Sequence, residues 1–174
     1  MKQKSKPDIK AIIQNIKKNR YLYAEILSVA VLIIFIIVLC AARSGGTDKS
    51  IEEISSPVIS TLQKGEMSKK TNADAIREFG IDISKTDGIV YYENENIMNV
   101  SEMLIVKLKN ENDAREFESA IKKRVKNQKN LYKNYAPEAY ALLNDCIIKT
   151  SSNTVFYCTS KNADELYETF KEAM

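Results

Sequence analysis

The chain has 174 residues, which is room for one domain and a short anchoring segment. Charged residues make up 28% of it and hydrophobic residues 44%, an ordinary globular balance. Histidine is absent, which excludes Ser-His-Asp and Cys-His nucleophiles, histidine-ligated zinc and the commonest general base. The 5 glycines are scattered, so there is no glycine-rich phosphate loop, and the 3 cysteines cannot form a Cys₄ site. We therefore expect a protein that is not an enzyme and has no cofactor and no metal.

Residues 26–42 read ILSVAVLIIFIIVLCAA and carry no charge. Counted from residue 21, the stretch has 22 residues and is interrupted only by Glu25, and about 20 apolar residues suffice to cross a bilayer. A core helix of a globular domain would show a polar face, whereas this run has only Ser28. Residues 21–42 are therefore predicted to form a transmembrane helix in contact with the lipid bilayer.

The end of this segment, IIVLCAARSGG, allows three fates. Lipid attachment at Cys40 would need a small residue before it, and Leu39 is large. Cleavage after Ala42 would have small residues in the expected places, but the preceding basic segment and the apolar run are long for a signal peptide. A retained anchor is the favoured interpretation, and cleavage and lipidation stay open.

Charge on the two sides of this segment predicts its orientation. Residues 1–20 carry 7 basic residues and 1 acid, whereas residues 43–62 carry 2 basic residues. The excess of positive charge places the tail, 1–20, in the cytoplasm and the rest outside. We therefore expect a single-pass cell-membrane protein with a flexible stalk at residues 43–50 and an extracytoplasmic domain at residues 51–174. After residue 42 there are 19 basic and 21 acidic residues, so no nucleic acid is expected as a partner.

The periodicity of the outer segment predicts alternating helices and strands. Apolar residues with helical spacing begin at residue 51, Pro57 is expected to start the main helix, and Gly65 to end it. A second helix is expected at 72–79, closed by Gly80, and Asp87-Gly88 is expected to turn the chain into a strand at 89–92. Residues 103–109 alternate as a strand with Leu104, Val106 and Leu108 on one face.

The second half repeats this order. A long helix is expected at 113–133, capped by Asn110 or Asn112, with its inward face formed by Phe117, Ile121, Val125, Gln128 and Tyr132. A shorter helix starts at Pro137, a hairpin turns at residues 151–153, and a last helix follows, with Asn162 and Glu165 in capping-box spacing. The order ββα-ββα predicts an α+β fold: a four-stranded antiparallel sheet with helices on one face.

Two cysteines lie in this predicted hairpin. Pairing Ile148 with Phe156 would put Cys146 opposite Cys158 on one face, within disulfide range, and an extracytoplasmic site permits oxidation. A register shifted by one residue would send the thiols to opposite faces. Two free, buried cysteines are the favoured alternative.

Two groups of residues are candidates for recognition. Lys122, Lys126, Lys129 and Lys133 form a stripe on the long helix, which could meet anionic lipid headgroups or an acidic envelope polymer; a solvated helix face is the favoured interpretation. Tyr132, Tyr135 and Tyr140 cluster around Pro137. They could form a recognition pocket, although packing of the helix joint is the more usual role.

Several segments together resemble the bacterial family called domain of unknown function 4358, over roughly residues 50–174. They are Phe79-Gly80-Ile81-Asp82, Leu104-Ile105-Val106-Lys107, Lys123-Arg124-Val125 with Gln128, and Tyr135-Ala136-Pro137-Glu138 with Tyr140, Leu142 and Leu143. The resemblance implies a membrane-attached or lipoprotein-like domain of Gram-positive bacteria and supplies no activity, ligand or catalytic residue. Members that resemble lipoproteins would have a small residue before their cysteine, and Leu39 departs from that pattern.

These observations lead to one functional expectation and two alternatives. We expect a membrane-anchored, extracytoplasmic, non-enzymatic binding module that meets a protein or an envelope polymer. The first alternative is contact with anionic polymer or lipid headgroups through the lysine stripe. The second is a hydrolase that uses paired carboxylates, which would need an acid pair with a strongly raised pKa in a concave site.

Overall fold

The computed structural model describes residues 25–37, 49–62, 67–96 and 98–174, and the chain divides into two units, Met1–Gly45 and Gly46–Met174. In the first unit, residues 25–37 form a helix whose large apolar side chains are 50–67% exposed. Within the part of the chain that the structure describes, no helix combines the length and the apolar character needed to cross a bilayer. The predicted tail and Cys40 lie outside the described residues, as do the ends of the predicted span and most of the stalk.

The second unit is built on a five-stranded antiparallel sheet in the order β1-β2-β3-β5-β4. Its strands are β1 (Ser68–Lys69), β2 (Thr86–Glu93), β3 (Glu102–Leu108), β4 (Ile147–Ser151) and β5 (Thr154–Thr159). The expected α+β class and the antiparallel pairing are confirmed, but the expected number of four strands is wrong. The extra strand, β1, pairs with the end of β2 and has only two residues, which is too short for a periodic pattern to reveal.

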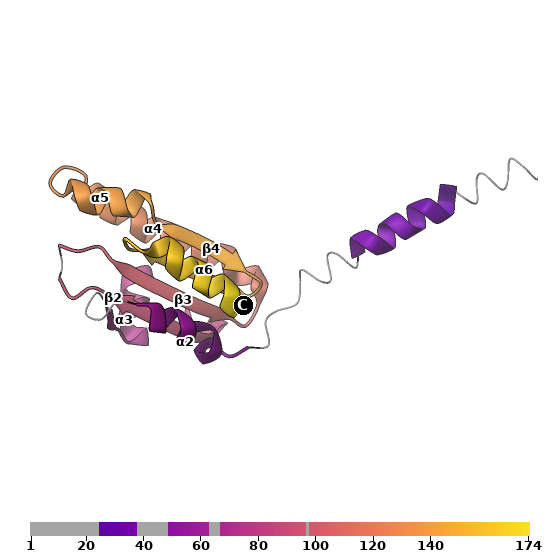
Figure 1. The fold of residues 1–174 in the computed structure, drawn as a ribbon, viewed down its shortest axis with the longest axis horizontal. Coiled ribbons are helices and arrows are strands. Elements are labelled where there is room, and N and C mark those ends of the chain that lie inside the picture. Colours follow the sequence, from indigo (N-terminus) through magenta and orange to yellow (C-terminus); the bar gives the residue numbers. More distant parts are fainter. Residues whose placement is uncertain (1–24, 38–48, 63–66, 97) are drawn as a thin grey trace, which may run out of the picture. The chain divides into compact units, whose positions relative to one another are not determined.

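Helices cover both faces of this sheet, so the prediction of helices on one face is wrong. They are α2 (Ile51–Thr61), α3 (Asn72–Phe79), α4 (Ala114–Tyr132), α5 (Pro137–Asn144) and α6 (Ala163–Ala173). α2 and α6 pack on one face, while α3, α4 and α5 pack on the other (Figure 1). The reason lies in the central strands β3 and β5, which are buried along almost their whole length and therefore need an apolar cover on both sides.

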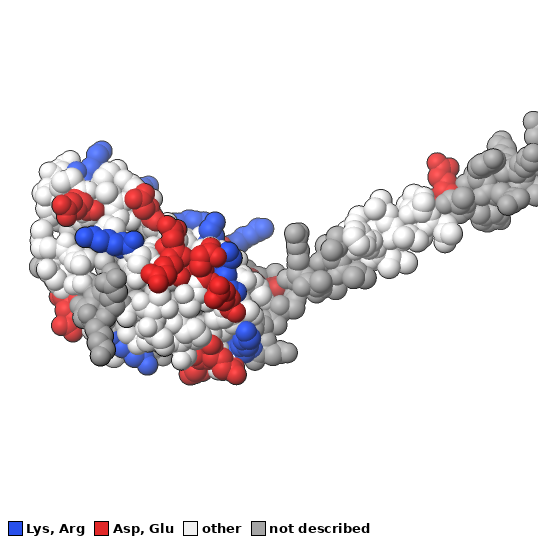
Figure 2. Space-filling view, in the orientation of Figure 1, with Lys and Arg blue, Asp and Glu red and all other residues white. Residues whose placement is uncertain are grey.

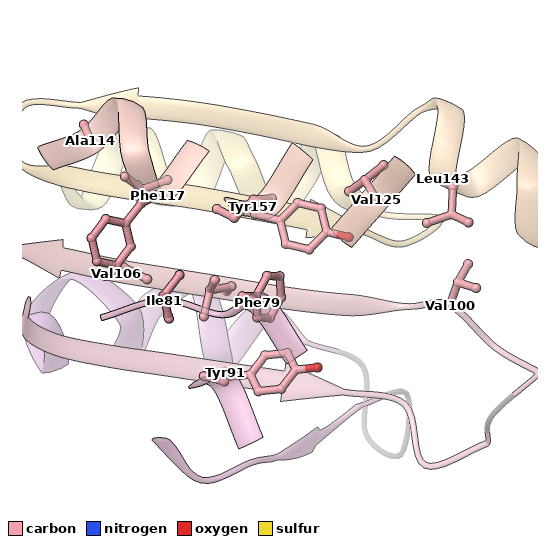
Figure 3. Close-up of a cluster of buried hydrophobic side chains, with 14 of the residues drawn as sticks. Phe79, Ile81, Tyr91, Val100, Val106, Ala114, Phe117, Val125, Leu143 and Tyr157 are labelled. Atoms are coloured by element: carbon pink, nitrogen blue, oxygen red, sulfur yellow. The ribbon is translucent and has the colours of Figure 1, made fainter. Parts of the chain in front are cut away.

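Side chains of β3 divide between two cores. Leu104, Val106 and Leu108 share one face, as predicted, and pack against α3, α4 and α5. Figure 3 shows this first core, with Phe79 of α3 and Phe117 of α4 among its members. Met103 and Ile105 point to the opposite face, into the second core under α2 and α6.

Local sequence signals mark most helix ends, but not always at the predicted residue. Ser50 and Glu53 form a capping box at the start of α2, so Pro57 lies inside this helix and does not begin it as expected. Gly65 is outside the described residues. The predicted helix at 72–79 is confirmed, and Gly80 ends it with a φ of 67°, a left-handed conformation that glycine adopts without strain.

Three further turn and cap predictions are wrong. Asp87-Gly88 lies within β2 at a register irregularity, not in a turn. A Cβ atom at Gly88 would lie 2.4 Å from the side chain of Ile51, so glycine is required there by the close approach of α2. Asn110 caps a short 3₁₀-helix before α4 and does not cap α4 itself. Asn162 occupies the N-cap position of α6 but makes no capping side-chain bond.

The β4–β5 hairpin has a register one residue away from the predicted one. Ile148 pairs with Tyr157, and Ile147 pairs with Cys158. The cause is a two-residue turn between Ser151 and Thr154, in which Ser152 adopts a φ of 53°, as tight hairpin turns require. Cys146 packs against the first core and Cys158 lies in the second. Cys146 and Cys158 form no disulfide with each other.

Candidate functional site

A glutamate lies inside the first core. Glu102 begins β3 on the same face as Leu104 and Val106, and it is 1% exposed. A carboxylate without partners at such a place would be very costly, because it has lost its water. Its partners therefore define the chemistry of this region.

Three side chains saturate the Glu102 carboxylate. Arg124 of α4 donates from Nη2 to Oε2 at 2.8 Å and from Nε to Oε1 at 3.0 Å. Tyr157 donates its hydroxyl to Oε1 at 2.7 Å, and Tyr91 donates to Oε2 at 3.2 Å. In Figure 3 both tyrosine hydroxyls point toward the same end of the core. The carboxylate is thus held from the sheet and the helix together.

The guanidinium of Arg124 serves two further carboxylates. Its side chain is 10% exposed. Nη1 donates to Glu78 of α3, and Nη2 lies 3.2 Å from Glu93 at the end of β2. The guanidinium carbon lies 4.9 Å from the ring centre of Phe79, a cation–π distance. The buried guanidinium therefore links α4 to three other elements, and its three carboxylate partners outnumber it.

This imbalance shifts the pKa values of the cluster. Burial disfavours the charged form of Arg124, but Glu102 and Glu78 outweigh it and raise the pKa of the guanidinium. Burial also opposes ionisation of Glu78, yet the hydrogen bonds and charges of Arg124 and Arg77 hold its pKa below the ordinary value. Burial and the negative charge of Glu102 outweigh the effect of Arg124 and raise the pKa of Glu93. Glu93 is therefore the carboxylate with the least compensation.

A hollow of about 450 Å³ lies directly over this cluster. It is lined by Lys70, Glu78, Glu93, Asn94, Glu95, Asn99, Val100, Arg124, Gln128, Leu131 and Tyr132. The charged lining consists of three glutamates, one lysine and one arginine, and Glu102 adds a further negative charge beneath it. The hollow is therefore electronegative.

The Oε1 atom of Gln128 is buried and has no hydrogen-bond partner among the described residues, so this lining carries an acceptor that lacks a donor.

A second group of acids has a different character. α6 exposes Asp164, Glu165, Glu168 and Glu172 on its outer side. Figure 2 shows acidic side chains gathered on the surface over α6. These carboxylates lie on a convex helix face and not in a hollow, so water can solvate them.

The lysine stripe lies away from the hollow. Lys122, Lys126 and Lys129 project from α4, and Lys133 follows the end of that helix. Lys122 forms an ion pair with Glu118 at 2.8 Å. Three of the four lysines of the stripe thus lie on α4 itself, and the contact of the stripe with an anionic surface stays a prediction.

The three candidate tyrosines are only partly brought together. Tyr132 is buried and lines the hollow, and its ring centre lies 5.5 Å from that of Tyr135. Tyr135 is 54% exposed. Tyr140 lies on α5, half-buried. Only Tyr132 thus belongs to the candidate site.

Sequence reasoning missed the residues that matter most here, although signals for them exist. Glu102 precedes Leu104 by two positions, so strand alternation already places it on the buried face. Arg124 follows Ile121 by three positions, which puts it beside the apolar stripe of α4 and not on its outer surface. An acid on the buried face of the strand and a base beside the buried face of the helix together predict an ion pair. Glu78 and Glu93 carry no comparable signal, because both lie at partly exposed ends of their elements.

No metal site accompanies the cluster in the described ranges, since no group of three or more His, Cys, Asp or Glu residues there is placed to hold an ion.

The fold defines the class of the protein as an α+β domain with an antiparallel sheet covered on both faces. The chain belongs to the family described as Domain of unknown function (DUF4358), which matches residues 60–160. No curated protein and no solved structure matches the chain. The family match includes every charged residue of the cluster and every residue that lines the hollow.

Proposed function

We propose that this protein is a membrane-anchored, extracytoplasmic, non-enzymatic binding module of a bacterial cell envelope. Residues 21–42 would hold it in the membrane, with the N-terminus in the cytoplasm. Its binding site is the hollow over the Arg124 cluster, and the partner is a protein that inserts a lysine or arginine side chain there. The observation that carries this proposal is the electronegative hollow.

The charges around the hollow favour a cationic group. Glu78, Glu93 and Glu95 line it, and Arg124 is already engaged by carboxylates. An incoming ammonium or guanidinium would add positive charge beside Glu93, the least compensated of these carboxylates. It would also bring N–H donors to a lining that holds the unpartnered oxygen of Gln128, and an unsatisfied buried acceptor costs about 1–3 kcal/mol.

The uncharged lining suits the rest of such a side chain. Val100, Leu131 and Tyr132 contribute apolar and aromatic surface to the hollow, and Leu131 is 60% exposed. Lysine and arginine bury their aliphatic stems along apolar surface while the charged head finds polar partners.

The membrane anchor is supported by the first unit. The uncharged run of residues 26–42 and the basic residues before it favour a single-pass orientation. The helix at residues 25–37 exposes isoleucine, leucine, valine and phenylalanine side chains in succession, a surface that lipid would cover. This helix alone would be about 20 Å long, whereas a full span of the hydrocarbon core needs about 30 Å.

Hydrolysis by paired carboxylates is the weaker proposal. Glu78 and Glu93 lie in a concave site with pKa values shifted in opposite directions, a pattern found in acid–base pairs. However, Arg124 binds both carboxylates, and an acid–base pair needs oxygen atoms that reach a substrate. Carboxylates that are engaged by Arg124 can still line a binding site, so the arrangement is compatible with ligand binding.

Calorimetry with the full-length protein in nanodiscs of zwitterionic lipid tests the binding site. The probes are acetyl-Ala-Lys-Ala amide and acetyl-Ala-Arg-Ala amide, with acetyl-Ala-Gln-Ala amide as the neutral control. We expect dissociation constants on the order of 1 mM for the cationic peptides, and no detectable binding of the control. Glu95→Gln should weaken binding, whereas Glu172→Gln on α6 should not. Equal binding of all three peptides would contradict the proposal.

The intact mass of the membrane-extracted protein tests the anchor. A full-length mass supports a retained helix. A mass that begins at Arg43 means cleavage and a released domain. A mass that begins at Cys40 with added acyl chains means lipid attachment in place of the helix.

A further inference from the structure

We propose that the groove between α4 and β4 binds an extended acidic segment of a protein partner, which adds to β4 as a further strand of the sheet. This site is separate from the hollow and does not depend on the function proposed for it. β4 is the last strand in the sheet order, and in the described part of the chain no other strand pairs with its outer side. Edge strands of this kind are the sites at which extended peptides pair with a sheet.

Contacts at its two ends show that α4 runs alongside β4 in the opposite direction. Near the end of β4, the hydroxyl of Thr150 donates to Glu118 Oε1 at 2.7 Å. Near its beginning, Cys146 and Lys129 line the same groove. From Glu118 to Lys129 the helix rises about 16 Å, and from Thr150 back to Cys146 the strand covers about 13 Å. The lysine stripe therefore follows the edge of the sheet.

The groove has an apolar floor and a basic rim. Its volume is about 320 Å³, and it is lined by Lys122, Val125, Lys126, Lys129, Cys146 and Ile148. Lys122 pairs with Glu118, but within the described ranges no carboxylate lies within salt-bridge distance of Lys126 or Lys129. These two ammonium groups give the groove an uncompensated positive charge, which favours an acidic occupant.

Spacing favours an extended peptide. Lys122 and Lys126 are about 6 Å apart along the helix axis, and side chains on one face of a strand repeat about every 7 Å. A strand added to β4 with acids at alternate positions would therefore bring successive carboxylates to successive lysines. Its other side chains would lie on the opposite face, beside Lys149.

The same observations disfavour other occupants. In a second copy paired edge to edge, β4 would face β4, and both lysine stripes and both Lys149 side chains would repel each other. A lipid headgroup or an acidic polymer satisfies the lysines but offers no regular backbone donors and acceptors to the edge of β4. The extended acidic segment satisfies both.

Fluorescence anisotropy with the full-length protein in zwitterionic nanodiscs tests the proposal. The probe is a labelled short peptide that alternates Glu and Thr. The control alternates Glu and Pro, which has the same charge but cannot donate backbone hydrogen bonds at proline. The first peptide should bind, and the second should bind at least about tenfold more weakly. The double variant Lys126→Gln/Lys129→Gln should weaken the first peptide about tenfold, whereas Lys123→Gln/Lys171→Gln should leave it unchanged.

Hydrogen exchange on the same samples supplies the structural readout. Slower exchange of β4 amides with the Glu-Thr peptide supports strand addition. Equal binding of both peptides would mean charge recognition alone and would overturn the proposal. Binding to vesicles that contain phosphatidylglycerol, with no binding of either peptide, would overturn it in favour of a lipid contact. Protection of β4 that rises with protein concentration and without peptide would overturn it in favour of a second copy.

Discussion

Arg124 and Glu102 form a two-point ion pair inside the domain, with Nη2 2.8 Å from Oε2 and Nε 3.0 Å from Oε1. Glu102 comes from the central strand β3, and Arg124 comes from α4, which covers it. Because both groups have left water, their mutual attraction mainly offsets the cost of burying them. The pair fixes how α4 lies on the sheet and places the remaining donors of Arg124 at the floor of the hollow.

Removal of the cation alone should be severely destabilising. Arg124→Met keeps an unbranched stem but leaves the buried Glu102 without its counter-ion, and we expect a loss of about 3–5 kcal/mol in the free energy of unfolding. Urea unfolding measures it. The double variant Arg124→Met/Glu102→Gln has no buried charge and should recover much of the loss. If the double variant is as unstable as the sum of the two single ones, the pair is not coupled.

The two rim glutamates should affect stability with opposite pH dependence. The pKa of Glu93 is raised by burial and by Glu102, so its contribution is present at acid pH and is lost as the pH rises through that raised value. Glu93→Gln should therefore stabilise the protein relative to the natural chain at neutral pH, and this gain should vanish in acid. Urea midpoints across the pH range measure both.

Glu78 supplies the matched control. Its pKa is lowered because Arg124 and Arg77 together outweigh burial, so its contribution is present at neutral pH and is lost as the pH falls through that lowered value. Glu78→Gln should destabilise the protein at neutral pH, and the cost should fade in acid. The same pH trend for both variants would contradict the assigned charge environment.

A side chain at Gly88 should destabilise the protein while Ile51 is present. A Cβ atom there would lie 2.4 Å from Ile51, so Gly88→Ala must push α2 away from β2, at a cost of about 1–3 kcal/mol. Thermal unfolding measures the effect. In an Ile51→Ala background the same substitution should cost clearly less, because the obstructing side chain is gone. Equal cost in both backgrounds would show that the backbone at Gly88, and not the contact, requires glycine.

The two cysteines of the hairpin should form no disulfide with each other even under oxidising conditions. Cys146 and Cys158 lie in cores on opposite faces of the sheet, and burial raises the pKa of the Cys146 thiol, which slows its reaction. Mass spectrometry after alkylation in denaturant, without reductant, should find both residues modified. A cross-linked peptide that contains both would contradict the register of the hairpin.

Much of the fold was predictable because local patterns dominate it. The alternation in β3, the apolar stripe of α4, the glycine that ends α3 and the proline that begins α5 all follow directly from the sequence. The second layer of helices was not predicted. Its signal was present, since LIVKL and VFYCT are apolar on both faces, a pattern typical of strands buried on two sides.

The candidate site was harder to predict, because it depends on residues far apart in the chain. Glu78, Glu93, Glu102 and Arg124 come from four elements, and only their packing brings them together. The burial of Glu102 and Arg124 could have been read from periodicity. The position of Glu93 at the rim depends on where β2 stops pairing with β3, which no local pattern specifies. The predicted register of the hairpin was wrong for a similar reason. One residue more or fewer in the turn decides which face of the sheet each cysteine occupies.

The most direct measurement is an NMR titration of the full-length protein in nanodiscs with acetyl-Ala-Lys-Ala amide, observed at the side-chain amide of Gln128 and the Nε–H of Arg124. We predict saturable shifts at both groups, abolished by the double variant Glu93→Gln/Glu95→Gln. The backbone amides of α6, with its four exposed acids, should remain unshifted. Shifts at α6 as large as those at Gln128, or no shift at Gln128, would show that the hollow does not select a cation and would contradict the account.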